Sequence, residues 1–219
     1  MARNKYPEET ERKILEVSRR LFQEKGYDHT TIQDIVHALG MSKGAIYHHF
    51  KSKEEIYDRI CDLYYDKLDW FRDLKQLPGT TGLEKMRNLL SFLLTDPEKL
   101  QIDQVSAALM LNPKLVLLAL RSTIRDAAPV VESLILAGNA DGSMQVLHPK
   151  ETAEAFMMLI NMWVGVFSTT RDAFDRKLIF LQEFSERMGM PIIDATIFEV
   201  AHRYYDTVMA AMPDCGLEL

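Results

Sequence analysis

Apolar residues recur along this chain at the spacing of an α-helix. Near the N-terminus Ile14, Val17 and Leu21 stand three or four residues apart, and the same spacing returns in the C-terminal part of the chain. This period places side chains on one face of a helix, whereas a half-buried strand needs strict alternation. No alternating run bounded by turn residues is long enough for a convincing strand. The spacing therefore predicts an all-α fold of about nine or ten helices.

Prolines and glycines indicate where these helices begin and end. Pro97, Pro113 and Pro149 stand where a first helical residue tolerates a missing N–H group. Pro129 lies inside an otherwise helical stretch, where we expect a kink. The sequence GNADGS at 138–143 predicts a turn. The expected helices include residues 8–25, 31–39, 42–49, 53–76, 114–137, 149–168 and 192–212.

The formal net charge of −6 is unevenly distributed along the chain. Residues 1–53 contain 10 Lys and Arg against 7 Asp and Glu, a net charge of +3, and residues 54–219 carry −9. A mildly basic end on an acidic body suits a polyanionic ligand that binds at one end only.

Several classes of protein are disfavoured by the sequence. Cys61 and Cys215 lie far apart and lack the spacing of a disulfide framework or a zinc site, so we expect no metal. The N-terminus lacks the apolar core of a signal peptide, and the apolar run at 156–167 is shorter than the roughly 20 residues of a membrane-spanning helix. No nucleophile elbow, phosphate-binding loop, dinucleotide fingerprint or HExxH motif occurs. We therefore expect a cytoplasmic protein with no membrane partner, no catalytic residues and no cofactor.

Residues 31–50 have the pattern of a helix-turn-helix motif. A short helix over 31–39 is followed by Gly40, which permits a tight turn, and by Ser42, which can cap the next helix. That second helix directs Ile46 and Phe50 to the interior. Two helices joined by a short turn with glycine form the unit whose second helix enters the DNA major groove.

The outward face of the second helix supplies the expected DNA contacts. Gly44 and Ala45 are small, so the backbone can approach the bases, and the Ala45 methyl group suits a thymine methyl. We expect Lys43 to reach guanine O6 and N7. The expected phosphate contacts come from Thr30, Thr31, Ser42, Tyr47, His48 and Lys53.

Two other interpretations of these residues remain open. Gly44 can instead permit close packing between helices of the same chain. His48 and His49 are adjacent, which can suggest a metal site, but neighbouring helical residues point in different directions and no acidic or cysteine partner lies at ligand spacing. The metal interpretation is therefore the weaker of the two.

The N-terminal segment resembles the DNA-binding domain of TetR-family transcriptional regulators. The resemblance is carried by ILEVSRRLFQEKGYDHT and by TTIQDIVHALGMSKGAIYHHFKSKEEIYDRI, with Val36 and His37 standing where the family usually has Ile-Ala. It implies a helix-turn-helix DNA-binding domain at 1–53 and a helical ligand-binding and dimerisation domain at 54–219. It also implies a homodimeric repressor that binds a palindromic operator in double-stranded DNA and is released by a small apolar or amphipathic effector.

The C-terminal domain offers two weaker sets of candidates. The helix at 149–168 is apolar nearly all round, so it must be buried on every side, either in the core or against a second copy of the chain. The dimer interpretation assigns to the interface Phe156, Ile160, Trp163, Phe167, Ile197, Tyr204 and Val208. An apolar effector pocket with a few polar groups would be lined by Met86, Leu90, Leu93, Gln104, Met110, Leu117, Arg121 and Trp163, although these residues equally suit an ordinary core.

Two rival functions remain at this point. The first is a DNA-binding protein of the same fold that ignores small ligands and recruits a protein partner through its acidic body. The second is an all-helical enzyme or carrier whose N-terminal helices only support the fold. Salt-sensitive DNA binding would separate the second from the others, because phosphate contacts release counterions.

Overall fold

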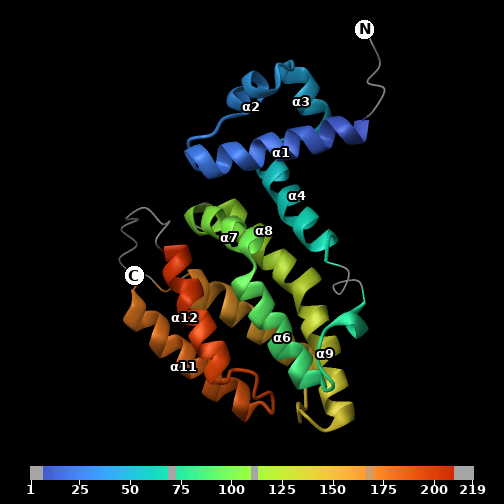
Figure 1. Ribbon diagram of the computed structural model, residues 1–219, viewed down its shortest axis with the longest axis vertical. Helices are drawn as coiled ribbons and strands as arrows, with labels where there is room; N and C mark the ends of the chain where they lie inside the picture. Colours follow the sequence, from blue (N-terminus) through green and yellow to red (C-terminus); the bar gives the residue numbers. More distant parts are fainter. Residues whose placement is uncertain (1–6, 69–72, 110–112, 167, 169, 210–219) are drawn as a thin grey trace. The chain divides into compact units, whose positions relative to one another are not determined.

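The chain is organised as two compact units, Met1–Leu68 and Asp69–Leu219. The computed structural model describes residues 7–68, 73–109, 113–166, 168 and 170–209 (Figure 1). Every regular element among these residues is a helix, and none of them forms a strand, which confirms the all-α prediction. None of the described helices combines the length and the apolar character needed to cross a membrane.

The N-terminal unit forms four helices over its described residues, 7–68. These are α1 (Pro7–Lys25), α2 (Ile32–Leu39), α3 (Lys43–His49) and α4 (Lys53–Asp66). Helix α1 contacts both α2 and α4, and α2 contacts α3. One isoleucine from each helix fills the centre, because the helical spacing turns these side chains inward; they are Ile14, Ile35, Ile46 and Ile56, each fully buried.

Helix α4 corrects the expected domain boundary and the expected helix at 53–76. The boundary lies after residue 68 rather than after residue 53, because α4 packs against α1. The helix itself ends at Asp66, with Lys67 as its C-cap. Residues 69–72 fall outside the described part of the chain, and Leu74–Gln76 form a separate 3₁₀ turn, η1.

The C-terminal unit contains seven α-helices and two π-helical segments among its described residues, besides η1. The α-helices are α6 (Gly82–Thr95), α7 (Pro97–Leu109), α8 (Pro113–Ser122), α9 (Ala128–Asp141), α10 (Pro149–Met158), α11 (Arg171–Arg187) and α12 (Ala195–Met209), and the π segments are η2 (Thr123–Ala127) and η3 (Leu159–Val166). Helix α9 contacts both α6 and α10, and α12 contacts α6 and α7. The core between them is built from aliphatic and aromatic side chains, including Leu134, Ile135, Phe156, Leu181 and Ile192.

The π segments interrupt two of the expected long helices. Segment η2 immediately precedes Pro129, which has no N–H group to donate within the helix. The Nδ2 atom of Asn161 in η3 lies 3.3 Å from Oγ1 of the buried Thr123 in η2. The two irregular segments are therefore joined by a hydrogen bond between side chains.

The end of α9 lies against the beginning of α6 (Figure 1). The expected turn at 138–143 starts later than the sequence predicted, because α9 continues to Asp141 and only Gly142, with φ of 80°, leaves the helix. The Asp141 carboxylate accepts the Gly82 N–H group at 2.7 Å, and the Ser143 hydroxyl accepts the Leu83 N–H group at 3.2 Å. This turn therefore supplies the caps for free N–H groups at the start of α6.

The same contact depends on the absence of a side chain at Gly82. A Cβ atom added to Gly82 would lie 2.2 Å from the Gly138 nitrogen and 2.7 Å from the Leu134 oxygen. Both neighbours are backbone atoms, which cannot rotate away. The helices approach this closely only because position 82 is glycine, whereas a Cβ atom added to Gly138 would meet the Met144 side chain at 2.8 Å.

We expect Gly82→Ala to destabilise the C-terminal unit by about 1–3 kcal/mol, the usual cost of overpacking a closely packed site. Ala140→Ser, at an exposed position of α9, is the matched control and should change stability little. Urea unfolding of the two variants measures the difference. Equal stabilities would mean that the helices separate freely at this point.

Candidate nucleic-acid interface

The turn between α2 and α3 is closed by caps on both sides. Gly40 has φ of 63°, in the left-handed region, and its N–H group donates to the His37 carbonyl at 3.3 Å. Two residues later the Ser42 hydroxyl accepts the Ala45 N–H group at 3.2 Å and starts α3. The connection between the helices is thus only 40–42, as a helix-turn-helix motif requires.

Helix α3 has one buried face and one exposed face. Ile46 and Phe50 are buried in the unit, as the sequence predicted. The exposed residues of the helix are Lys43, Gly44, Tyr47 and His48, preceded by the exposed cap Ser42, while Ala45 is half-buried. The predicted DNA-contacting residues of α3 therefore lie on a common, accessible face.

Gly44 has no packing role within the described residues. A Cβ atom added there would meet no other atom within 4 Å. Its φ angle also lies outside the left-handed region, so the backbone does not require glycine. A glycine inside a helix costs about 1 kcal/mol relative to alanine. The packing explanation for Gly44 is therefore not supported, and close approach of an external surface is the explanation that remains.

Two ring contacts orient the side chains on this face. The Lys43 ammonium lies 5.8 Å from the centroid of the Tyr47 ring, which is 44% exposed. Such a distance permits a cation–π attraction that holds the amine near the helix surface. The His48 and His49 rings meet edge to face at 5.4 Å. Among the described residues, no three His, Cys, Asp or Glu side chains are arranged to hold a metal ion.

Thr30 does not present its hydroxyl group to the exterior, which corrects its prediction as a phosphate contact. The side chain is 0% exposed, and its hydroxyl group lies within hydrogen-bond distance of the Gly26 carbonyl at 2.7 Å and the Leu21 carbonyl at 3.2 Å. Leu21 lies in the last turns of α1, and Gly26 directly follows that helix. Thr30 therefore joins the beginning of α2 to the end of α1.

Thr31 is exposed, but its polar groups are already engaged. Its hydroxyl accepts the Asp34 N–H group at 3.1 Å, and its own N–H group donates to the Asp34 carboxylate at 2.8 Å. This reciprocal pair is a capping box, with Asp34 in the place usually taken by Glu or Gln. Thr31 is therefore first of all the cap of α2, and the predicted phosphate contact would compete with that role.

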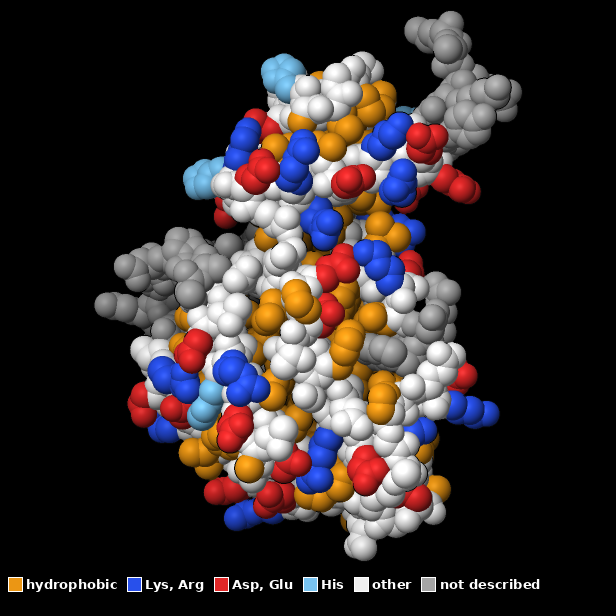
Figure 2. All heavy atoms as spheres, viewed as in Figure 1, with side chains coloured by type: hydrophobic (Ala, Val, Ile, Leu, Met, Phe, Trp, Pro, Cys, Tyr) orange, Lys and Arg blue, Asp and Glu red, His pale blue; other side chains and the backbone are white. Residues whose placement is uncertain are grey.

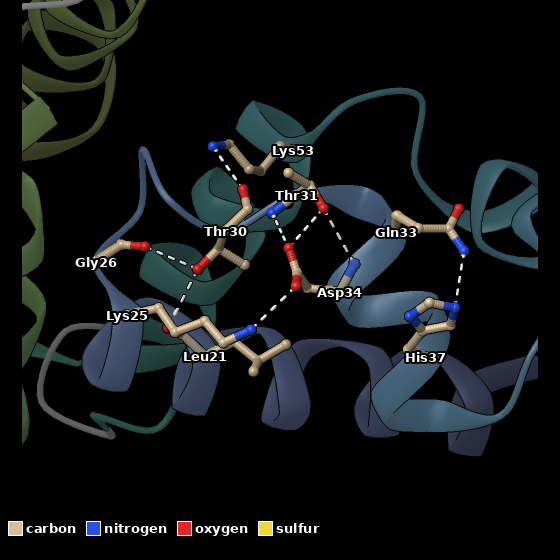
Figure 3. A network of polar contacts seen from close by, with 9 residues as sticks. All are labelled: Leu21, Lys25, Gly26, Thr30, Thr31, Gln33, Asp34, His37 and Lys53. Atoms are coloured by element: carbon tan, nitrogen blue, oxygen red, sulfur yellow. Dashed lines mark hydrogen bonds and ion pairs between the residues drawn. The ribbon is translucent and has the colours of Figure 1, made fainter.

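Asp34 was not singled out from the sequence, although the spacing of a threonine and an acidic residue three positions later is a recognisable signal. The Lys25 ammonium lies 3.0 Å from its carboxylate. Hydrogen bonds from Thr31, together with the Lys25 charge, hold the pKa of Asp34 well below its ordinary value. Figure 3 shows Lys25 of α1 beside Thr31 and Asp34 at the start of α2, together with Lys53 of α4.

Lys53, predicted as a phosphate contact, is engaged by groups of its own unit. Its ammonium group donates to the Tyr27 carbonyl at 2.6 Å and to the Thr30 carbonyl at 2.9 Å. It lies 3.9 Å from the Tyr27 ring centroid. Burial lowers the pKa of Lys53, and the nearby Asp28 and Glu54 carboxylates oppose that shift.

The net positive charge of the N-terminal segment is not gathered into one patch on the face seen in Figure 2. Basic and acidic side chains alternate over this part of the N-terminal unit. Several basic residues of α1, α2 and their neighbours are paired with acids, including Lys13 with Glu9 at 2.9 Å and Arg59 with Asp66 at 3.2 Å. The composition therefore pointed to the correct end of the chain, but the exposed face of α3 is the more specific observation.

The residues proposed for an effector pocket do not share one environment. Met86 is buried in the core, and Leu90, Leu93 and Trp163 pack against it. Leu117 is half exposed and Arg121 is exposed, so both lie at the surface of the isolated unit. Gln104 donates to the Thr207 carbonyl at 3.0 Å, and Met110 lies outside the described residues.

The predicted dimer interface requires a clear correction. Phe156, Ile197 and Val208 are buried within the protomer and cannot contact a second copy. Ile160 and Trp163 are partly buried against the same core, the half-buried Tyr204 donates to Asp103 at 2.8 Å, and Phe167 falls outside the described residues. Apolar content alone did not distinguish a core face from an interface face.

Exposed apolar side chains lie on α11, a helix for which the sequence predicted no interface residues. Ile179 and Phe180 are 47% and 49% exposed. The Phe180 ring contacts Trp163 edge to face at 5.3 Å and stacks on Phe184 at 6.2 Å. The helical spacing of 180 and 184 was the available signal.

Comparison with known proteins agrees with the helix-turn-helix geometry. Residues 14–60 match the family model of bacterial regulatory proteins of the tetR family. The N-terminal unit is therefore similar to the DNA-binding domain of that family. The match lies within the N-terminal unit, where the caps, the turn and the exposed face of α3 are found.

Helix-turn-helix transcriptional regulators are similar to parts of this chain. The chain is 48% identical over 56 residues to the uncharacterised regulator YerO of Bacillus subtilis, a match that covers 26% of this chain and 19% of YerO. It is 30% identical over 104 residues to the transcriptional repressor Rv1474c of Mycobacterium tuberculosis, covering 48% of this chain and 50% of that protein. It is 31% identical over 87 residues to IcaR of Staphylococcus aureus, the negative regulator of the biofilm operon icaADBC, covering 40% and 47%. The matches thus span about half or less of these relatives.

Solved structures match over more of the chain. A transcriptional regulator from Saccharomonospora viridis, solved in complex with choline, superposes with a TM-score of 0.54 at 26% identity and covers 81% of this chain and 96% of its own. GusR of Salmonella enterica gives a TM-score of 0.59 at 20% identity, covering 84% of this chain and 100% of its own. The second likeness concerns the fold alone.

The capping box predicts a pH-dependent stability. Because the pKa of Asp34 is lowered in the folded state, its stabilising contribution is fully present above the ordinary carboxyl pKa of about 3.9 and is lost as the pH falls through the lower folded value. We therefore expect Asp34→Asn to lower the melting temperature at pH 7 and to differ less from the wild type near pH 3. Thermal unfolding at the two pH values measures this.

Thr31→Ala serves as the matched variant for that experiment. It removes a hydroxyl partner of the carboxylate and the N-cap of α2, at a cost of about 1 kcal/mol. A difference between Asp34→Asn and the wild type that is as large at pH 3 as at pH 7 would contradict the assignment.

Proposed function

We propose that this protein is a cytoplasmic transcriptional repressor that binds a palindromic operator in double-stranded DNA as a homodimer. The observation that carries the proposal is the exposed glycine at position 44, on the leading turn of α3, with open space above it. The major groove is about 12 Å wide, so a helix enters it most deeply where its side chains are smallest. Lys43 and Tyr47 stand beside the glycine on the same exposed face, where they can read or position a duplex.

The roles of the α3 residues follow from their chemistry. Lys43 is proposed to donate to guanine O6 and N7, and Ala45 to touch a thymine methyl group. Ser42, Tyr47 and His48 are proposed to contact phosphates, which fix the register of the helix without reading sequence. IcaR and Rv1474c, named as a negative regulator and a repressor, support repression as the outcome.

The C-terminal unit is proposed to bind a small apolar or amphipathic effector and not to transform it. The S. viridis regulator, solved in complex with choline, supports a small-molecule effector. Segments η2 and η3 are the region we select for it, because π-helical segments occur frequently at functional sites. They carry Thr123, Asn161 and Trp163, one hydroxyl, one amide and one indole. Effector and operator would then oppose each other through one coupling free energy, typically about 1–3 kcal/mol.

A second copy of the chain is proposed to cover the exposed aromatic contact on α11. Ile179 and Phe180 expose apolar surface that water solvates poorly, and a two-fold axis would bring the same face of each copy together. Two α3 helices about 34–36 Å apart would reach successive major grooves on one face of the duplex.

Gly44→Ala tests DNA binding directly. The added methyl group should stabilise the folded protein by up to about 1 kcal/mol, since glycine is a poor helix former and space is available. The same methyl group should weaken binding to the DNA upstream of its own gene by about tenfold or more, or at least about 1.4 kcal/mol. Thermal unfolding and fluorescence anisotropy measure the two effects.

Ser133→Ala, on the exposed face of α9, is the control that improves helix propensity away from α3, and it should leave DNA affinity unchanged. Tight, salt-sensitive binding by wild type with no loss in Gly44→Ala would remove the reason for placing α3 in the groove. No salt-sensitive binding by wild type at all would contradict the proposed function.

The dimer is tested by Phe180→Glu, which should convert the protein to a monomer in analytical ultracentrifugation, because a buried unpaired carboxylate is strongly unfavourable. Leu147→Glu is the matched control, since Leu147 is 89% exposed elsewhere in the unit and should tolerate the charge. A dimer that survives Phe180→Glu would exclude α11 as the interface.

A further inference from the structure

Lys53 begins α4, yet its ammonium group is engaged on the connection that leads from α1 into α2. It donates to the carbonyls of Tyr27 and Thr30, at 2.6 and 2.9 Å. Its nitrogen also lies 3.9 Å from the Tyr27 ring centroid. Two of its three N–H donors are thus directed to backbone oxygens, and the charge lies against an aromatic ring.

The two carbonyls stand at opposite ends of a short segment, 27–30, that precedes α2. Tyr27 is 2% exposed, and its ring packs on Phe22 of α1 at 5.0 Å and on Tyr57 of α4 at 5.7 Å. Thr30 is fastened to the end of α1 by its buried hydroxyl. Both acceptors are therefore attached to well-packed residues, and Lys53 joins them to α4 (Figure 3).

A phosphate at this position would have to compete with these contacts. Hydrogen bonds from a charged donor are shorter and stronger than neutral ones, and moving the ammonium group to a phosphate would leave two carbonyls without it. Lys43 differs from Lys53 in both respects. Its side chain is exposed, and its ammonium group lies 5.8 Å from the Tyr47 ring centroid.

We propose that Lys53 is a positioning residue, which fixes the start of α2 to the first residue of α4 and so sets the presentation of α3, and that it is not a phosphate ligand. This inference deepens the proposed DNA binding, and one of its two tests rests on that function. The other test is independent of DNA.

The DNA-independent test is hydrogen–deuterium exchange on the full chain. Lys53→Met keeps an unbranched side chain of similar length but removes the donors. We expect amide exchange in residues 26–36 to accelerate by about tenfold, with no acceleration in the middle of α1 or α4, since local openings are reported separately from global unfolding. Lys53→Arg, which can donate to both carbonyls, should return the exchange rate to within about threefold of wild type.

The second test is the salt dependence of binding to a duplex from the region upstream of its own gene, between about 50 and 200 mM salt. Lys53→Met should bind about tenfold more weakly with the slope of log affinity against log salt unchanged, whereas the loss of a phosphate ligand would reduce the magnitude of that slope by about one. Lys53→Arg should recover most of the affinity.

The outcomes separate the two proposals. A slope reduced by about one in Lys53→Met would identify a phosphate ligand and overturn the inference, and so would unchanged exchange in residues 26–36. If wild type shows no salt-sensitive binding, the proposed function fails, while the exchange rates of Lys53→Met and Lys53→Arg still decide whether Lys53 positions α2.

Discussion

The buried hydroxyl group of Thr30 is the interaction on which the N-terminal unit depends. A hydroxyl with no partner in the interior would cost several kilocalories per mole, so Thr30 must remain where it can meet the Gly26 and Leu21 carbonyls. This requirement fixes where α2 begins with respect to α1. Because the turn at 40–42 is short, the direction of α2 then determines the direction of α3 and the face that α3 exposes.

The sequence predicted best those features that depend on neighbours within a few residues. The bounds of α2 and α3 differ from expectation by a single residue, because caps such as Ser42 and the left-handed Gly40 act locally. The inward direction of Ile46 and Phe50 follows from helical spacing alone. The start of the DNA-facing helix was therefore within reach of sequence reasoning.

Features that depend on distant partners were not predictable in the same way. Lys53 donates to carbonyls 23 and 26 residues earlier in the chain. Every residue has a backbone carbonyl, so the residue types in the sequence do not indicate which carbonyls a distant lysine will contact. Phe156 and Phe180 are chemically identical, yet the first is buried in the protomer and the second is half exposed. The packing of parts of the chain that are distant in sequence decides between them, and apolar content alone does not show which residues are buried within the protomer.

The contact between Gly82 and Gly138 also restricts how sequences of this kind can diverge. Because Gly82 leaves room for the α9 backbone and Gly138 leaves room for the Met144 side chain, a side chain at position 82 requires the helices to move apart. Such a move would also withdraw Asp141 and Ser143 from the N–H groups of Gly82 and Leu83. Substitutions at 82, 138, 141 and 143 are thus expected to occur together in related sequences, although the two ends of this contact lie sixty residues apart in the chain.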